Sequence, residues 1–306
     1  MKITPPFTRY ILVSLCLFLH TACDQLNGET SASALNESVT PVGDAFPKKE
    51  KVWIIAHRGD WRNFPENSLE GIQSCIEKGF DIVEIDVRLT KDSIPVLMHD
   101  VTLDRTTNGK GNIANLTWQE VQQLNLKNGL GRTTIFKVPS LEEVLKLTKG
   151  KIIINLDKSY SIFKFLMPYI RKYDMSNQIL LKGEIPVEQM EKDLGPLLTE
   201  IQFMPIVNLK KPGAEKIIEG YLSQHPPFAI EYVFGSDTSA ILNNIRQYKK
   251  NGVKAWANSL WPSLNGGHDD DLATTNPEEA YGWLIAKGFN MIQTDRPVLL
   301  KTYLEN

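Results

Sequence analysis

The fold is decided by Asp81-Ile-Val-Glu-Ile-Asp-Val87 and, seven residues further on, Pro95-Val-Leu-Met-His99. Both stretches are rich in β-forming residues. A crossover between parallel strands needs a dozen or more residues, whereas an antiparallel hairpin needs very few. We therefore expect a β-hairpin that brings His99 roughly opposite Glu84 or Val83.

Outward from this hairpin, β-rich runs alternate with amphipathic stretches through residues 51–306. The pattern predicts strands at 52–57, 81–87, 95–99, 151–157, 178–182, 201–207, 228–233, 253–258 and 290–294. It predicts helices at 67–78, 117–124, 140–148, 161–173, 186–193, 213–223, 238–250 and 277–287. Strand–helix alternation over this length is typical of a TIM (β/α)8 barrel. Nine strands are predicted for an eight-stranded barrel because one of them, at 95–99, belongs to the hairpin.

The composition is that of an ordinary globular protein. The chain has 306 residues, of which 42% are hydrophobic and 23% charged, which excludes disordered, collagenous and polytopic membrane proteins. With 34 Lys and Arg against 36 Asp and Glu, the formal net charge is -2, so we expect no nucleic-acid partner. Three cysteines are too few for a disulfide framework.

The N-terminus has the pattern of an export signal. A basic start precedes the apolar run Tyr10–Leu19, which is too short to span a bilayer, and small residues lead to Cys23. This pattern resembles a bacterial lipoprotein signal, with residues 1–22 removed, Cys23 lipidated and residues 23–50 as a flexible tether. A lipid-anchored protein of the cell envelope is the expectation, on the periplasmic or outer-membrane face. A plain secretory signal cut nearby is the alternative.

The densest polar cluster lies in the first third of the chain. His57-Arg58 ends the first predicted strand, and His99 ends the hairpin strand. Glu84 and Asp86 are two residues apart, so both project from one face of their strand, which we expect to be the barrel interior. Two buried carboxylates are costly unless a cation neutralises them, and oxygen ligands suit Mg²⁺ or Ca²⁺.

These residues belong to a longer series of motifs that resembles the glycerophosphodiester phosphodiesterase family over about residues 52–300. The motifs are Ala56-His57-Arg58-Gly59, Pro65-Glu66-Asn67-Ser68, Glu84-Ile-Asp86, Val96-Leu-Met-His99-Asp100, Arg105-Thr106-Thr107 and Thr294-Asp295-Arg-Pro297. The resemblance implies a TIM barrel with a small insertion at about residues 101–138. It also implies metal-dependent hydrolysis of small glycerophosphodiesters to sn-glycerol 3-phosphate and an alcohol.

The resemblance also suggests a role for each polar residue. Glu84 and Asp86 would bind the metal, with Arg58 beside it on the phosphate oxygens. His57 would act as the base and His99 as the acid on the leaving oxygen. In the family, the substrate's own 2-hydroxyl attacks phosphorus and gives a cyclic intermediate.

The chain departs from the family at the fourth predicted strand, residues 151–157. The family has Glu-x-Lys there, whereas this strand reads Asn155-Leu-Asp157. We expect Asp157 to be the third metal ligand. Lys182, at the end of the next strand, would supply the missing cation at the phosphate, or is an ordinary rim lysine.

Two further departures affect substrate choice. Trp256 would stack on the substrate glycerol, or else fill the barrel. The long loop 260–271 would lie on the active-site rim, and its acids would bind a polyol head group or a second cation, or be a solvated surface. The alternatives are therefore an enzyme for inositol-type or phospholipid head-group diesters, as in sphingomyelinase D-like enzymes, and a non-catalytic phosphoester-binding lipoprotein.

Overall fold

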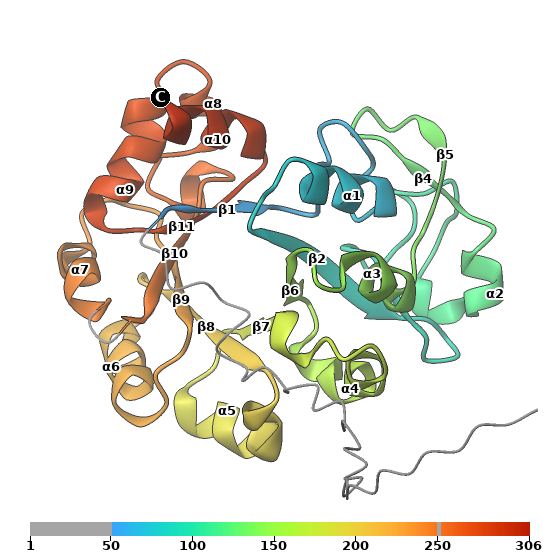
Figure 1. Ribbon diagram of the computed structural model, residues 1–306, viewed down its shortest axis with the longest axis horizontal. Helices are drawn as coiled ribbons and strands as arrows, with labels where there is room; N and C mark the ends of the chain where they lie inside the picture. Colours follow the sequence, from blue (N-terminus) through green and yellow to red (C-terminus); the bar gives the residue numbers. More distant parts are fainter. Residues whose placement is uncertain (1–50, 250–251) are drawn as a thin grey trace, which may run out of the picture. The chain divides into compact units, whose positions relative to one another are not determined.

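The structure is a computed structural model that describes residues 51–249 and 252–306. Within this part of the chain, eight parallel strands form a ring that closes between β1 and β2 (Figure 1). In barrel order they are β1 (Trp53–Ala56), β2 (Ile82–Leu89), β6 (Ile153–Asp157), β7 (Ile179–Gly183), β8 (Gln202–Asn208), β9 (Ala229–Val233), β10 (Lys254–Asn258) and β11 (Met291–Thr294). The predicted TIM barrel is confirmed.

The predicted hairpin is also confirmed. β3 (Pro95–Leu97) pairs antiparallel with β2, and Val87 lies opposite Leu97. Continued two residues, this register sets His99 beside Ile85 and not beside Glu84 or Val83 as expected. The hairpin is centred on residue 92, so the residue opposite His99 differs by one from Glu84 and by two from Val83, and His99 lies beyond the end of β3.

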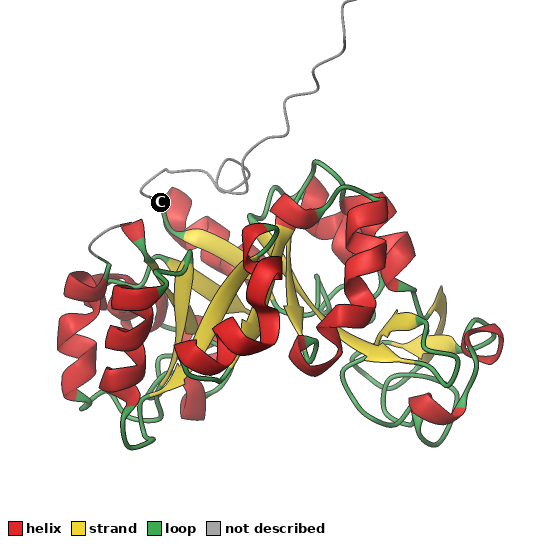
Figure 2. Ribbon diagram, turned by 90° about the horizontal axis from the view of Figure 1, so that it is seen from below, coloured by secondary structure: helices red, strands yellow, loops and turns green. Residues whose placement is uncertain are grey.

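Helices follow the strands around the outside of the barrel (Figure 2). They are α1 (Leu69–Glu77), α3 (Leu141–Thr148), α4 (Phe163–Lys172), α5 (Val187–Leu194), α6 (Ala214–Gln224), α7 (Ile245–Tyr248), α8 (Asp270–Ala273), α9 (Trp283–Lys287) and α10 (Pro297–Glu305). The predicted helix 277–287 opens with a π-turn over Glu278–Gly282. Two helices lie outside the predicted set. They are α8, whose four residues are too few to show a helical period, and α10, which begins at a proline in the first helical position.

The barrel interior has two levels. An apolar plug fills the N-terminal end and consists of Trp53, Ile55, Ile82, Ile153, Leu180, Met204, Ala229, Trp256 and Met291. Polar residues follow several of these by two positions and so face the same interior, nearer the C-terminal end. They are Glu84, Asn155, Lys182, Glu231, Asn258 and Gln293, all buried. Val83, Ile85 and Val87 pack in the other core, between strands and helices.

The segment between β3 and α3 forms a small subdomain with its own core. It contains α2 (Trp118–Val121) and a two-stranded sheet of β4 (Asn125–Lys127) and β5 (Thr133–Lys137). Its core consists of Val96, Met98, Leu103, Ile113, Val121, Leu126 and Val138. The subdomain is therefore packed on the hairpin that carries His99.

Candidate active site

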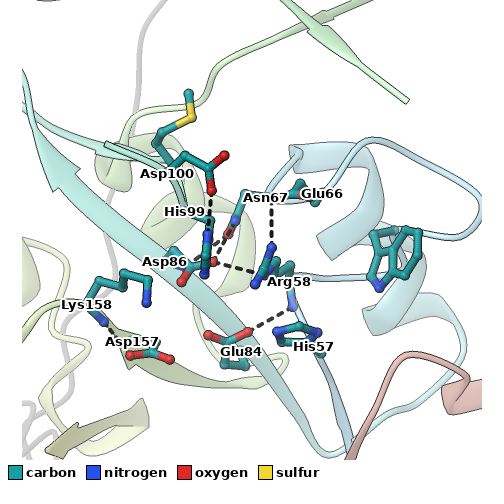
Figure 3. A network of polar contacts seen from close by, with 12 residues as sticks. His57, Arg58, Glu66, Asn67, Glu84, Asp86, His99, Asp100, Asp157 and Lys158 are labelled. Atoms are coloured by element: carbon teal, nitrogen blue, oxygen red, sulfur yellow. Dashed lines mark hydrogen bonds and ion pairs between the residues drawn. The ribbon is translucent and has the colours of Figure 1, made fainter. Parts of the chain in front are cut away.

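Three carboxylates converge at the C-terminal mouth of the barrel. Glu84 and Asp86 project inward from β2, and Asp157 ends β6, the neighbouring strand (Figure 3). One oxygen from each lies within 4.8 Å of the other two. Glu84 and Asp86 are buried, at 0% and 1% exposed.

The electrostatics of this cluster favour a bound cation. Burial, together with the neighbouring Asp86, raises the pKa of Glu84 well above its usual value. The Oε1 atom of Glu84 is buried and accepts no hydrogen bond. Three carboxylates with one oxygen left unpaired fit a hard divalent cation such as Mg²⁺ or Ca²⁺.

Lys182 lies inside the barrel, so its reading as a rim lysine is wrong. It is 6% exposed, and its Nζ lies 3.2 Å from Asp157 Oδ2 and 3.4 Å from Glu231 Oε2. Burial alone would raise the pKa of Asp157, but Lys182 lowers it to about 2. Lys182 therefore keeps Asp157 ionised and ties the carboxylate cluster to β9.

Trp256 does not face a substrate, contrary to the first expectation. Its indole is fully buried in the apolar plug, and its Nε1 donates to Asn258 Oδ1 over 2.9 Å. Lys182 Nζ lies 5.9 Å from the centre of the ring. Trp256 therefore forms part of the floor beneath Lys182.

Arg58 adjoins the carboxylates through both its backbone and its side chain. Its backbone N–H donates to Glu84 Oε2 over 2.9 Å, and its Nε lies 3.5 Å from Asp86 Oδ2. Asn67 donates from Nδ2 to Asp86 Oδ2 and accepts from the Asp86 backbone N–H. Arg58 and Asn67 both have left-handed backbones, with φ of 54° and 56°. Such strain in residues other than glycine is typical of functional sites.

His57 is held by a carboxylate that the sequence analysis gave no role. Its Nδ1 lies 2.7 Å from Asp295 Oδ1, which also accepts from Trp61 Nε1 over 2.6 Å. Burial would raise the pKa of Asp295, but these hydrogen bonds lower it below its usual value. The position of Asp295 directly after the last barrel strand was the available signal, because barrel sites gather at strand ends.

His99 has a matching partner. Its Nδ1 lies 2.7 Å from Asp100 Oδ1, and Arg105 Nε donates to Asp100 Oδ2 over 2.8 Å. The hydrogen bonds from Arg105 and then His99 lower the pKa of Asp100. Arg105 also binds Glu66, whose Oε1 accepts from Arg58 over 3.1 Å. A continuous chain of ion pairs thus runs from the small subdomain to Arg58.

His57 and Arg58, with their partners Asp295, Glu66 and Arg105, line a cleft of about 430 Å³. The barrel side contributes His57, Arg58, Trp61, Glu66, Trp261 and Asp295, and the subdomain contributes Arg105, Thr106, Lys127, Asn128, Gly129 and Gly131. Trp261, which comes from the 260–271 loop, is 43% exposed and meets the His57 ring edge-on at 6.1 Å. The cleft is therefore walled by aromatic and cationic side chains, as an anionic organic substrate requires.

The remainder of the 260–271 loop is anchored rather than solvated. Asn265 and Asp270 are buried, and His268 stacks on Trp283 at 3.7 Å. Asp269 caps α8 by accepting from the backbone N–H groups of Asp271 and Leu272. Of the three acids, only Asp271 points to solvent, with 89% of its side chain exposed.

Fold and site together define a (β/α)8-barrel protein with a candidate metal and histidine site at the C-terminal mouth. Comparison with known proteins agrees. Residues 57–183 match the model of the glycerophosphoryl diester phosphodiesterase family, and residues 203–304 match a domain of unknown function.

Individual relatives identify the family. A Bacillus subtilis protein named "Putative glycerophosphodiester phosphodiesterase YhdW" is 39% identical over 253 residues, 80% of this chain and 95% of that protein. The Caldanaerobacter subterraneus glycerophosphodiester phosphodiesterase is 34% identical over 141 residues, 44% of this chain and 58% of that protein's length. The crystal structure of a Parabacteroides distasonis glycerophosphoryl diester phosphodiesterase has a TM-score of 0.72 and 26% identity, covering 87% of this chain and 92% of that one. The chain belongs to the glycerophosphodiester phosphodiesterase family.

Proposed function

We propose that this protein hydrolyses glycerophosphodiesters to sn-glycerol 3-phosphate and an alcohol. The observation that carries the proposal is the presence, at one mouth of the barrel, of three clustered carboxylates and the His99–Asp100 pair (Figure 3) together with the His57–Asp295 pair, so that each histidine has its Nδ1 2.7 Å from a carboxylate of its own. Mere binding of a phosphoester needs no such acid–base pair, which argues against the non-catalytic alternative.

Glu84, Asp86 and Asp157 would hold the divalent cation, and Mg²⁺ or Ca²⁺ suits their oxygen ligands. When bound, such a cation neutralises the charge that otherwise repels a nucleophile from a phosphodiester. Arg58, whose Nε lies 3.5 Å from Asp86 Oδ2, also lines the cleft and would add a fixed positive charge for the non-bridging oxygens. Lys182 serves this site indirectly, by keeping Asp157 ionised.

The two histidines divide the proton transfers. The Nδ1–H of His57 donates a hydrogen bond to Asp295. The lone pair on Nε2 of His57 is then free, so His57 can act as the base. That base would take a proton from the substrate's 2-hydroxyl as it attacks phosphorus and displaces the alcohol to give a cyclic diester, which water would then open to sn-glycerol 3-phosphate. His99, held by Asp100, would protonate the leaving oxygen.

A turnover assay on three diesters tests the proposal: glycerophosphocholine, glycerophosphoinositol and a diester without glycerol. We expect release of sn-glycerol 3-phosphate from the first two, and a loss of about 10³-fold in kcat for His57→Ala and for His99→Ala. His225→Ala, with 38% of the side chain exposed, is the control. Turnover of the glycerol-free diester alone would favour the head-group alternatives, and unchanged kcat in His57→Ala would refute the mechanism.

We further propose that the protein is lipid-anchored in the bacterial envelope through Cys23. The support is the sequence pattern alone, because Cys23 and its flanks lie outside the described residues. Among the residues that the structure describes, no helix is long and apolar enough to cross a bilayer. Mass spectrometry of the mature N-terminus should find an acylated Cys23, and Cys23→Ser should release active protein. An unmodified N-terminus elsewhere would refute the anchor.

A further inference from the structure

Asp270 connects the ends of two barrel strands. Its backbone N–H donates to the carbonyl oxygen of Ser259, directly after β10. Its Oδ1 accepts from the hydroxyls of Ser259 (2.8 Å), Tyr281 (2.9 Å) and Thr294 (2.6 Å). Its Oδ2 accepts from the backbone N–H of Asp295 over 2.6 Å. One side chain thus fixes the point where β11 ends.

The four groups that donate to this carboxylate are hydroxyls and a backbone amide, which carry no charge. Asp270 is 1% exposed, and burial raises its pKa to about 6 although its hydrogen bonds lower it. A buried anion with neutral partners is a costly arrangement. A carboxylate accepts from all four donors at once, whereas an amide would turn its NH₂ group toward either the Asp295 N–H or the three hydroxyls and so lose some of these hydrogen bonds.

The fixed strand end is the one that orients His57. Asp295 is held on both sides of its Cα, at its backbone N–H by Asp270 and at its carbonyl oxygen by Arg62 Nε (2.9 Å). Its side chain, thus fixed, accepts from His57 Nδ1 and Trp61 Nε1. We propose that Asp270 is a positioning residue that sets the orientation of His57 through Asp295.

This inference rests on the proposed function for the role of His57, but its geometry can be tested separately. Asp270→Asn keeps the size of the side chain and replaces one hydrogen-bond-accepting oxygen with a hydrogen-bond-donating NH₂ group. Asp271→Asn is the matched control, because it removes the same charge one residue away from an exposed side chain that lies 3.4 Å from Arg296. Both variants should be compared with the full wild-type chain.

The first readout is kinetic. Asp270→Asn should lower kcat on glycerophosphocholine by about 10- to 100-fold with KM within about two-fold, because a misplaced catalytic group costs rate and not binding. Asp271→Asn should match the wild type. A wild-type kcat in a folded Asp270→Asn variant would overturn the proposal.

The second readout is the proton NMR signal of the His57 Nδ1–H in its bond to Asp295, assigned by its loss in His57→Ala. It should shift or vanish in Asp270→Asn and persist in Asp271→Asn, whether or not the wild type turns over any diester. An unchanged signal in Asp270→Asn would overturn the proposal even if the enzymatic assignment holds. If Asp270→Asn does not fold, Tyr281→Phe removes one donor, and an unchanged signal and kcat there would overturn it equally.

Discussion

Lys182 shows how a departure from the family pattern is absorbed within the site. On β6 the family's Glu-x-Lys is replaced by Asn155-Leu-Asp157, and Lys182 on the neighbouring β7 places its ammonium group 3.2 Å from Asp157 Oδ2. The Nζ of Lys182 lies between Asp157 and Glu231, and Asn258 Nδ2 donates to the other oxygen of Glu231 over 2.8 Å. The positive charge is thus retained, but on a different strand.

Removal of the buried ammonium group of Lys182 should strongly destabilise the folded protein. Lys182→Met leaves the buried Glu231 and the partly exposed Asp157 without the cation they share, so we expect the free energy of unfolding to fall by about 3–5 kcal/mol. Lys211→Met, which breaks an exposed pair with Glu184, should cost less than about 1 kcal/mol. Urea unfolding of both variants makes the comparison. Equal losses would mean that Lys182 is no more than a surface lysine.

The ionisation of Asp270 should make stability depend on pH. Its pKa is about 6 in the folded state against 3.8 for an ordinary aspartate, so the folded state binds the proton more tightly. The resulting stabilisation is present below about pH 4 and is lost as pH rises through about 6. The loss is about 3 kcal/mol relative to Asp270→Asn, which has no such titration. Urea titrations of both proteins from pH 4 to 7 measure it, and parallel curves would contradict the assignment.

Among the elements, the 260–271 loop differs most from expectation. Trp261 lies at the cleft as the rim position predicts, but Asn265, Asp269 and Asp270 are buried against neighbouring residues and neither line the cleft nor face solvent. Gly266 donates its N–H to the Phe234 carbonyl, and a Cβ on Gly266 would lie 2.8 Å from the backbone nitrogen of Asp237. A Cβ on Gly267 would meet nothing within 4 Å, although both glycines have positive φ.

The two glycines therefore form a matched pair. Gly266→Ala should cost about 1–3 kcal/mol more than Gly267→Ala, because it adds a backbone clash to a φ strain that both variants share. The thermal midpoint of each variant, measured at the same pH, provides the test. Equal midpoints would show that the loop moves freely away from its neighbours.

The barrel strands and the hairpin were predictable because strand alternation and connection length are local properties of the sequence. Glu84, Asp86 and Asp157 followed from the same reasoning, since strand parity determines which side chains share the interior. Asp295 and Asp270 did not follow. His57 is 238 residues from Asp295, and the partners of Asp270 are 11 to 25 residues away from it. Local sequence periodicity does not indicate contacts between residues so far apart.

At the scale of the whole molecule, the two matched family regions are parts of one barrel. The first ends at residue 183 and the second begins at 203, yet β7 and β8 pair across this gap, with Lys182 opposite Met204. β11 also pairs with β1. Asp295, directly after β11, is hydrogen-bonded to His57, directly after β1. The boundary between the two regions is therefore not a domain boundary.

A single cooperative unfolding transition should follow from this closure. Circular dichroism and tryptophan fluorescence should give coincident thermal curves, because Trp53 and Trp256 lie in the plug shared by both regions. Two separated transitions would contradict the closed barrel as one folding unit.

Diester hydrolysis by this protein is proposed to depend on a divalent cation held by Glu84, Asp86 and Asp157. The most direct test is the release of sn-glycerol 3-phosphate from glycerophosphocholine by wild-type protein stripped with a chelator, then supplied with Mg²⁺ or Ca²⁺. We predict loss of turnover on stripping and recovery with at least one of the two ions, and no recovery in Glu84→Gln at the same concentrations. Full activity of the stripped protein in excess chelator would contradict the account.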